Sequence, residues 1–353
     1  MQYNAAVDRA TTHALRGSAE SSRRLHRYRT EGSPDVHGHI YLNSHLAART
    51  PDEITPSMPE VVVDYPREAF ADVQKRLWPG RTVGALVFGT VGPRDDIEAM
   101  NAYVGESARI CGWEALMVPE MTDDNDTILA KVRAGGFLGL KPYWTFVTWK
   151  HQNDVTLEDM VTPAMREAAD RGRLLVMVHI PRPGRLADPV NIAGMRKLCS
   201  DAPNATIVLA HFGRAYFPEA IGDGLALAAI DNLHVDLSMV QHSEVIEAAL
   251  RAFGSRRVMF GLDLPVAQEK GKLISVNGQR HFFTKRAHSW SVHAEPGSYE
   301  VRCTLFAYEM VRAIQRAATN LGLTDSEIED VFHNNAHRLT HSICARKADT
   351  DRL

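Results

Sequence analysis

The sequence predicts an α/β fold, and within that class a distorted (β/α)8 TIM barrel with long loops after its first and eighth strands. Short apolar runs alternate with amphipathic, helix-like stretches, and eight such runs span about 225 residues, or roughly 32 per unit. Strands that alternate with helices favour a parallel sheet, and eight of them favour a closed barrel. With 44% hydrophobic and 24% charged residues among 353, the composition is that of an ordinary globular protein.

The eight apolar runs are the expected strands. In chain order they are Val36–Leu42, Val83–Phe88, Ala115–Val118, Phe137–Leu140, Leu174–Val178, Ile207–Ala210, Leu233–Leu237 and Val258–Leu262. Helix signals lie between them, as in "SEVIEAALRAFGS", where we expect Ser243 to cap the helix and Gly254 to end it. The two longest connections are residues 43–81 and 264–300. Both follow barrel strands, so we expect them to cover the substrate, with mobile surface loops as the alternative.

Three segments are expected: a basic, helical N-terminal extension over residues 1–33, the barrel over 34–345 and a polar tail over 346–353. The extension is faintly similar to a transit peptide, although a solvated helix is the simpler interpretation. The net charge of −3 gives no reason to expect nucleic acid or a membrane as a partner, and no apolar run reaches transmembrane length. Four scattered cysteines without a C-x-x-C motif are typical of reduced thiols, so we expect a cytoplasmic protein.

Two histidines, His37 and His39, stand one residue apart in the first expected strand. Residues i and i+2 of a strand point to the same face, so the two imidazoles would converge and begin a metal site. The pattern alone is weak, because 16 histidines in this chain give about 0.7 such pairs by chance.

Four other expected strands end in a polar residue: strand 4 at Lys141, strand 5 at His179, strand 6 at His211 and strand 8 at Asp263. The carboxyl ends of barrel strands meet at one mouth, and a buried polar residue there is costly unless it is paired or bound to a metal. A single such residue would be an ordinary satisfied core group, but an ordered set is hard to attribute to chance. Histidines with a carboxylate suit Zn²⁺, which activates water, and Asp263 can shuttle the proton.

These motifs resemble the amidohydrolase superfamily, and within it the amidohydrolase-related (family 2) group, which includes lactonases, hydratases and non-oxidative decarboxylases. The resemblance rests on "DVHGHI", "GFLGLKPY", "VMVHIP", "IVLAHFGR" and "VMFGLDLP", with "VFHNNAHRL" near the C-terminus. It covers roughly residues 33–342, and its specificity lies in the ordered set rather than in any one motif.

The resemblance implies a divalent metal with four ligands: His37, His39, His179 and Asp263. It also implies that Asp263 and His211 are catalytic, with His211 orienting or polarising the substrate or binding a second metal. Zn²⁺ is the expected ion and Mn²⁺ the alternative, because these ligands accept both. Lys141 stands where some members carry a carboxylated lysine between two metals. One metal, with an unmodified Lys141 that binds a substrate anion, is the favoured interpretation.

Basic and polar residues after the strand ends are the candidate substrate contacts. They are Lys141, Tyr143, Arg182, Arg185, Arg214 and Ser238. Arginine binds carboxylates in a bidentate manner, so we expect a small, anionic substrate, although each residue also suits a structural role. Asp35 is a candidate to fix the tautomer of a metal-bound histidine, or simply to form a turn.

The leading hypothesis is therefore a metal-dependent hydrolase that acts on a carboxylated lactone, ester or amide through a metal-activated water. A non-oxidative decarboxylase or a hydratase with the same metal site is the alternative. Several decarboxylases of this group replace the first histidine of the pair with glutamate, so His37 favours hydrolysis. A non-catalytic metal-binding relative would require a damaged site. A homodimer or higher homo-oligomer is a family-level expectation only.

Overall fold

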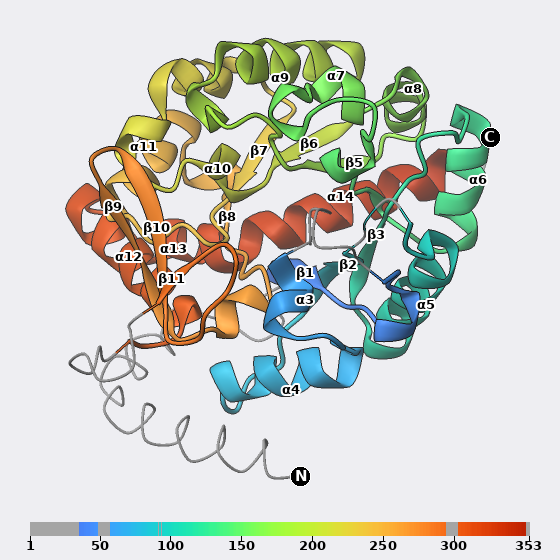
Figure 1. Cartoon of the computed structure of the whole chain (residues 1–353). Helices are drawn as coiled ribbons and strands as arrows, with labels where there is room; N and C mark the ends of the chain where they lie inside the picture. Colours follow the sequence, from blue (N-terminus) through green and yellow to red (C-terminus); the bar gives the residue numbers. More distant parts are fainter. Residues whose placement is uncertain (1–34, 49–56, 91, 93, 294–302, 351–353) are drawn as a thin grey trace, which may run out of the picture.

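The computed structural model describes residues 35–48, 57–90, 92, 94–293 and 303–350, so the predicted extension over 1–33 and the end of the tail lie outside the described residues. Eight parallel strands form one sheet in chain order (Figure 1). They are β1 (Asp35–His39), β2 (Ala85–Phe88), β3 (Glu114–Met117), β4 (Gly139–Leu140), β5 (Leu175–Val178), β6 (Thr206–Leu209), β7 (Leu233–Asp236) and β8 (Val258–Met259). Hydrogen bonds from His39 N to Leu264 O (3.0 Å) and from Asp263 N to His37 O (2.7 Å) join the chain after β8 to β1. The predicted (β/α)8 barrel is confirmed.

Helices cover the outside of the barrel and close one of its ends (Figure 1). In chain order the helical segments are α3 (Ser57–Val61), α4 (Arg67–Leu77), α5 (Ile97–Cys111), α6 (Asn125–Ala134), α7 (Leu157–Met160), α8 (Pro163–Arg171), α9 (Pro189–Asp201), α10 (His211–Arg214), α11 (Ser243–Phe253), α12 (Phe306–Leu321), α13 (Asp325–Glu329) and α14 (Asn335–Thr350). Of these, α10 is a short left-handed turn at the mouth of the barrel. Leu339 and Ile343 of α14 belong to the same buried cluster as Val36 and Leu86 from the barrel interior. Helix α14 therefore closes the end of the barrel where the strands begin.

One helix boundary differs from its sequence-based prediction. Helix α11 starts at Ser243 itself, and His242 precedes it without any side-chain capping bond. The predicted capping role of Ser243 is therefore wrong, because its hydroxyl lies inside the first turn. Gly254 ends the helix as predicted, with a φ of 70° that a side chain disfavours.

A register irregularity in β1 lets Val36 face the barrel interior together with both histidines of the pair. The pairing of β1 with β2 shifts between Asp35 and Gly38, as at a β-bulge. Val36 belongs to the interior cluster, and the rings of His37 and His39 nevertheless also face the interior, 5.0 and 4.7 Å from the ring of Phe88. Strict alternation along the strand would have placed either Val36 or the two histidines inside, but not all three.

The two long connections carry secondary structure of their own. Helices α3 and α4 follow β1, and the segment after β8 forms a separate sheet of β9 (Gly271–Val276), β10 (Gln279–Thr284) and β11 (Val292–His293). Strands β9 and β10, orange in Figure 1, pack on α12 through Phe282 and Phe306, whose ring centroids lie 5.9 Å apart. What the sequence predicts as a loop is thus largely an ordered β-hairpin.

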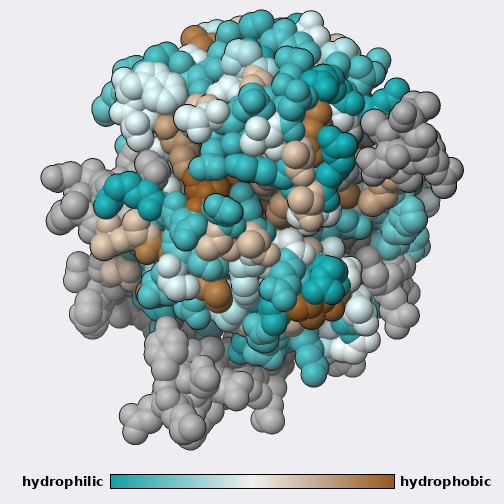
Figure 2. All heavy atoms as spheres, turned by 90° about the vertical axis from the view of Figure 1, so that its right-hand side faces the viewer, coloured by the Kyte–Doolittle hydropathy of each residue, from teal (hydrophilic) through white to brown (hydrophobic). Residues whose placement is uncertain are grey.

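The surface is mainly polar. Figure 2 shows one face of the molecule, on which hydrophilic side chains predominate and apolar ones form separate small patches. Scattered apolar residues of this kind are normal on a folded protein. None of the helices in the described part of the chain has both the length and the apolar character needed to cross a bilayer.

Gly38 lies between the paired histidines at a position without room for a side chain. A Cβ there would lie 2.6 Å from Cε2 of Phe70 in α4. We expect Gly38→Ala to lower the free energy of unfolding by about 1–3 kcal/mol, measured by urea denaturation. Adding Phe70→Leu should restore part of this loss through a favourable coupling in a double-mutant cycle, whereas purely additive effects would contradict the steric explanation.

Candidate metal centre

The ends of the barrel strands surround a cavity of about 250 Å³. Its walls are formed by His37, His39, Met58, Glu60, Thr90, Lys141, Tyr143, Trp144, Thr145, His179, His211, Arg214, Tyr216, Met239, Asp263, Val266, Arg280, Phe282, Ser289 and Trp290. Residues from both long connections are among them, so these segments cover the cavity as predicted. Most of the predicted strand-end residues also meet here.

Three metal-ligand atoms converge inside this cavity, from His37 and His39 in β1 and from Asp263 after β8. Nε2 of His39 lies 3.1 Å from Oδ1 of Asp263, and Nε2 of His37 lies 3.6 Å from the same oxygen. An ion that binds each ligand at about 2.0–2.2 Å, with angles between 90° and tetrahedral, holds neighbouring ligand atoms about 2.8–3.6 Å apart. The spacing therefore fits three ligands of one ion.

The hydrogen bonds on the outer side of each imidazole fix which nitrogen faces this point. Nδ1 of His37 donates to Oδ2 of Asp236 (3.0 Å), and Nδ1 of His39 faces the carbonyl oxygen of Gly89 (3.2 Å). Since these partners are acceptors, Nδ1 carries the ring proton and Nε2 a lone pair. Nε2 of His39 and Oδ1 of Asp263 are buried without a hydrogen-bond partner although they lie 3.1 Å apart. Two facing lone pairs fit a bound cation.

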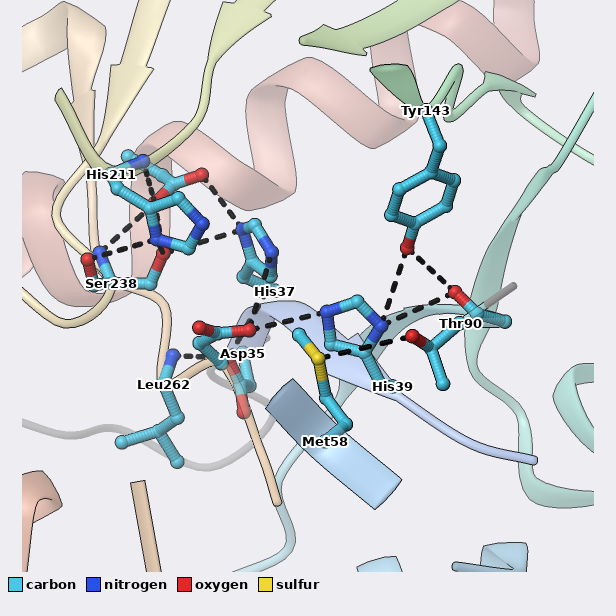
Figure 3. Close-up of polar contacts among 12 residues, drawn as sticks. Asp35, His37, His39, Met58, Thr90, Tyr143, His211, Ser238 and Leu262 are labelled. Carbon is cyan, nitrogen blue, oxygen red and sulfur yellow. Dashed lines mark hydrogen bonds and ion pairs between the residues drawn. The ribbon is translucent and has the colours of Figure 1, made fainter. Parts of the chain in front are cut away.

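The surroundings favour the protonation states that metal ligands need. Figure 3 shows His37 between His39 and His211. Burial lowers the pKa of His39 and the pKa of His211 to about 4, so both rings are neutral near pH 7. Burial alone would raise the pKa of Asp263, but the nearby imidazoles, His211 foremost, outweigh it and hold that pKa at about 2. Neutral imidazoles beside an ionised carboxylate are the binding form of such a site.

Asp236, the last residue of β7, supports the cluster and is absent from the sequence-based site. It is fully buried and accepts hydrogen bonds from Nδ1 of His37, from the backbone nitrogens of His211 (3.0 Å) and Ser238 (2.9 Å), and from the Ser238 hydroxyl. Asp236 could have been predicted from the sequence, because "LHVDLS" places an acidic residue at the end of an expected strand, as for the other candidates. Contrary to expectation, Ser238 is not in the cavity wall, since its side chain is fully buried against Asp236 and His211.

Asp35 has a backbone role instead of the suggested contact with a histidine ring. Its Oδ1 accepts from the backbone nitrogens of His37 (3.2 Å) and Leu262 (2.8 Å), and its Oδ2 accepts from Nε2 of Gln74 (2.8 Å). The carboxylate thus ties β1 to the chain after β8. Asp236 holds the ring of His37 instead.

A left-handed turn after β6 presents His211 and Arg214 to the cavity. The φ angles of His211, Phe212, Gly213 and Arg214 are 53°, 45°, 62° and 58°. This conformation costs roughly 1–2 kcal/mol for each residue other than glycine, and such strain clusters at functional sites. The bond from His211 N to Asp236 holds the turn in place.

The environment of His211 also defines what its ring can do. Nδ1 lies 2.8 Å from Oγ and 3.2 Å from the carbonyl oxygen of Ser238, whose own hydroxyl proton is given to Asp236. Nδ1 therefore carries the proton, and Nε2 is an acceptor. A neutral His211 can orient a water or a hydroxyl group, but it cannot donate to an oxyanion from Nε2.

His179 and Lys141 line the cavity at the edge of the cluster. The ring of His179 lies 5.2 Å from that of His211, and its Nδ1 is buried without a hydrogen-bond partner. Within the described ranges, the ligand-atom groups that lie within 4.8 Å of one another do not include His179, so the structure gathers three of the four predicted ligands. Lys141 is 1% exposed, and its ammonium lies 5.1 Å from the ring centre of Phe88. Burial lowers the pKa of Lys141 to about 8.

The predicted substrate contacts divide into two groups. Arg214 and Tyr143 line the cavity, and the Tyr143 hydroxyl donates to Gly89 O (2.7 Å) next to His39 (Figure 3). Arg182 and Arg185 lie outside the cavity wall, contrary to expectation. Nε of Arg182 donates to Asp188 (3.0 Å), and the guanidinium of Arg185 lies 5.6 Å from the ring centre of Phe217.

Two cavity residues, Tyr216 and Arg280, had no usable signal in the sequence. Neither ends a predicted strand. Arg280 reaches the cavity only because β10 folds back over the barrel.

Comparisons with known proteins agree with this arrangement. A family model described as amidohydrolase matches residues 35–340. The search of curated proteins found no match.

Solved structures share the fold at low sequence identity. A zinc-bound amidohydrolase from Burkholderia multivorans is 16% identical with a TM-score of 0.56, over 88% of this chain and 99% of that one. A putative 2-pyrone-4,6-dicarboxylic acid hydrolase from Pseudomonas putida is 16% identical with a TM-score of 0.55, over 89% and 98%. The 5-carboxyvanillate decarboxylase of Novosphingobium aromaticivorans, a manganese complex, is 12% identical with a TM-score of 0.54, over 88% and 96%.

Replacing Asp236 tests its support of the metal ligands. In Asp236→Asn, the amide nitrogen would face backbone N–H donors, so we expect Zn²⁺ affinity to fall about 10–100-fold. A titration against a chromogenic chelator measures this, and the melting temperature of the metal-free protein reports on folding. Asp231→Asn, at an exposed residue two positions before β7, is the matched control and should bind as the wild type does. Equal affinities in both variants would show that Asp236 does not position His37.

Proposed function

The chain belongs to the amidohydrolase family, and on that premise we propose that it is a metal-dependent hydrolase of small anionic lactones, esters or amides. The observation that supports this best is the set of facing acceptor atoms on His37, His39 and Asp263, which are 3.1 and 3.6 Å apart and open to a cavity. We assign His179 as the fourth ligand, because its buried Nδ1 lacks a partner and it lines the same cavity. Zn²⁺ is the proposed ion and Mn²⁺ the alternative.

Asp263 is the proposed proton carrier. A divalent ion held by these ligands lowers the pKa of water toward 7 and polarises a carbonyl group. Oδ1 of Asp263 faces the imidazoles, whereas Oδ2 has no hydrogen-bond partner within the described chain. Oδ2 can therefore take the proton of the attacking water and deliver it to the leaving group.

His211 and the cations of the cavity orient the reactants. The Nε2 lone pair of neutral His211 accepts a hydrogen bond from the attacking water or from a substrate hydroxyl. Lys141 binds an anionic group of the substrate beside the metal ligands. Arg214 offers to a substrate anion the donors left free by its bonds to Ile180 O and Pro181 O (3.1 and 3.2 Å).

We propose one metal ion rather than two. A second group of possible ligands exists at His37, His211 and Asp236. Its atoms are already engaged in hydrogen bonds, since Asp236 accepts from Nδ1 of His37, from the backbone nitrogen of His211 and from the Ser238 hydroxyl, and Nδ1 of His211 is bonded to Ser238. A carboxylated Lys141 that bridges two ions would have to break this network. The unmodified lysine beside Phe88 needs no such change.

A non-oxidative decarboxylase is the second candidate. The free Oδ2 of Asp263 could equally protonate a substrate carbon, and the cationic cavity suits a carboxylate that leaves as CO2. The retained His37 favours the hydrolase. A panel of lactones and aromatic carboxylates, followed by product mass, separates the two, because hydrolysis adds one water and decarboxylation removes one CO2.

The role of Asp263 is testable once a substrate from this panel is turned over. We expect Asp263→Asn to lower kcat by about 10²–10⁴-fold, because the amide cannot accept the proton. Metal content must be measured in the same preparation, so that a lost ion is not mistaken for a lost base. Asp231→Asn serves as the control with unchanged kcat. Full metal content with wild-type turnover in Asp263→Asn would rule out this assignment.

A further inference from the structure

Three arginines without an acidic partner in the described chain lie near one another, two of them, Arg214 and Arg280, in the cavity wall and the third, Arg185, just outside it. Arg185 follows β5, Arg214 ends the left-handed turn after β6, and Arg280 lies on β10. Within the described ranges, none of them forms an ion pair with an aspartate or glutamate. Arg214 is held by backbone carbonyls, and Nε of Arg185 is buried without a hydrogen bond. The three side chains are only partly buried, and the cluster has no ion-pair partner among the described residues, so its positive charge is left without a counter-charge.

The three guanidinium groups act on one another. Burial, together with the charges of Arg280 and Arg214, lowers the pKa of Arg185 to about 10. Burial and the charge of Arg280 also lower the pKa of Arg214 to about 10. An anion placed between positively charged groups that are fixed close together reduces their mutual repulsion. The cluster is therefore arranged for an anion that the chain itself does not supply.

Tyr216 gives a second, independent indication of a ligand here. Its side chain is 5% exposed and lines the cavity, yet its hydroxyl makes no hydrogen bond within the described part of the chain. The ring lies 5.2 Å from the guanidinium carbon of Arg280 and 5.5 Å from the ring of Phe282. The ring is thus buried while the hydroxyl opens to the cavity without a protein partner among the described residues, so it is available to bond to a ligand oxygen there.

The remaining acid of the cavity wall does not neutralise the arginines. Apart from Asp263, the wall contains one carboxylate, that of Glu60. Both of its oxygens are engaged by Ser289, from the backbone nitrogen (2.8 Å) and from Oγ (2.6 Å). Lys141, the other cation of the wall, contacts Phe88 and Tyr143 instead of the arginines. The cavity thus has two separate positive regions.

We propose that Arg280, together with Arg214 and the Tyr216 hydroxyl, forms a second anion subsite, so that the enzyme selects substrates with two anionic oxygen groups. The inference rests on the proposed function and narrows its substrate class to dianions. One anionic group binds beside the metal ligands near Lys141, and the other binds under the β9–β10 hairpin. Arg280 is the specificity-determining residue, because it reaches the cavity from the hairpin rather than from a barrel strand.

Calorimetric binding to the metal-loaded, full-length protein tests the subsite without a known substrate. Benzoate and isophthalate differ only in the second carboxylate. We expect the wild type to bind isophthalate about tenfold or more tightly than benzoate. Arg280→Gln should remove this preference and leave benzoate affinity unchanged. Tyr216→Phe should reduce the preference to a smaller extent. A 3-phosphonobenzoate titration shows whether carboxylate or phosphonate suits the subsite better.

Arg182→Gln is the matched control, since Arg182 is paired with Asp188 outside the cavity wall and its loss should leave both affinities unchanged. Equal binding of isophthalate and benzoate by the wild type, or binding of neither, would overturn the proposal. So would an equal loss of both ligands in Arg280→Gln. Turnover is measured in a separate assay. If the protein prefers the dianion but hydrolyses no substrate, the second anion subsite stands and the proposed hydrolase function is wrong.

Discussion

The site depends on three buried acceptor atoms that face one another without a proton between them. Nε2 of His37, Nε2 of His39 and Oδ1 of Asp263 would repel each other in an apolar interior unless a cation lay among them. The rest of the barrel mouth keeps these atoms in place. The alternation of side chains along β1 points both imidazoles inward, and the bond between Asp263 N and His37 O fixes the carboxylate opposite them. A metal ion bound by these atoms would convert this unfavourable arrangement into a stable one.

The supporting residues form a continuous chain from the ligands to the substrate side of the cavity. Asp236 holds the ring of His37 and, through His211 N, the strained turn after β6. The same turn places Arg214 in the cavity wall. Any change that loosens Asp236 therefore affects ligand orientation and substrate binding together. The strain of a left-handed turn is tolerated because a buried carboxylate fixes its first residue.

The sequence was sufficient for the barrel and for the strand-end residues, because both follow from local periodicity and from the common mouth of parallel strands. His37, His39 and Asp263 could be found in this way. Asp236 is also a polar residue at the end of an expected strand, β7, and is absent from the predicted site. Contacts that depend on the tertiary structure could not be predicted from local sequence patterns. Arg280 enters the cavity only through the fold of the hairpin, and Arg182 is withdrawn from it by Asp188, six residues away in the chain.

The central claim, that His37, His39 and Asp263 hold one divalent ion, is tested most directly by elemental mass spectrometry of the purified, untreated protein. We expect about one equivalent of zinc or manganese per chain. A folded His39→Gln variant, measured in parallel, should retain much less. Two equivalents per chain would contradict the single-ion site and point to a carboxylated Lys141. No metal after attempted reconstitution, or equal metal in the variant, would contradict the metal centre itself.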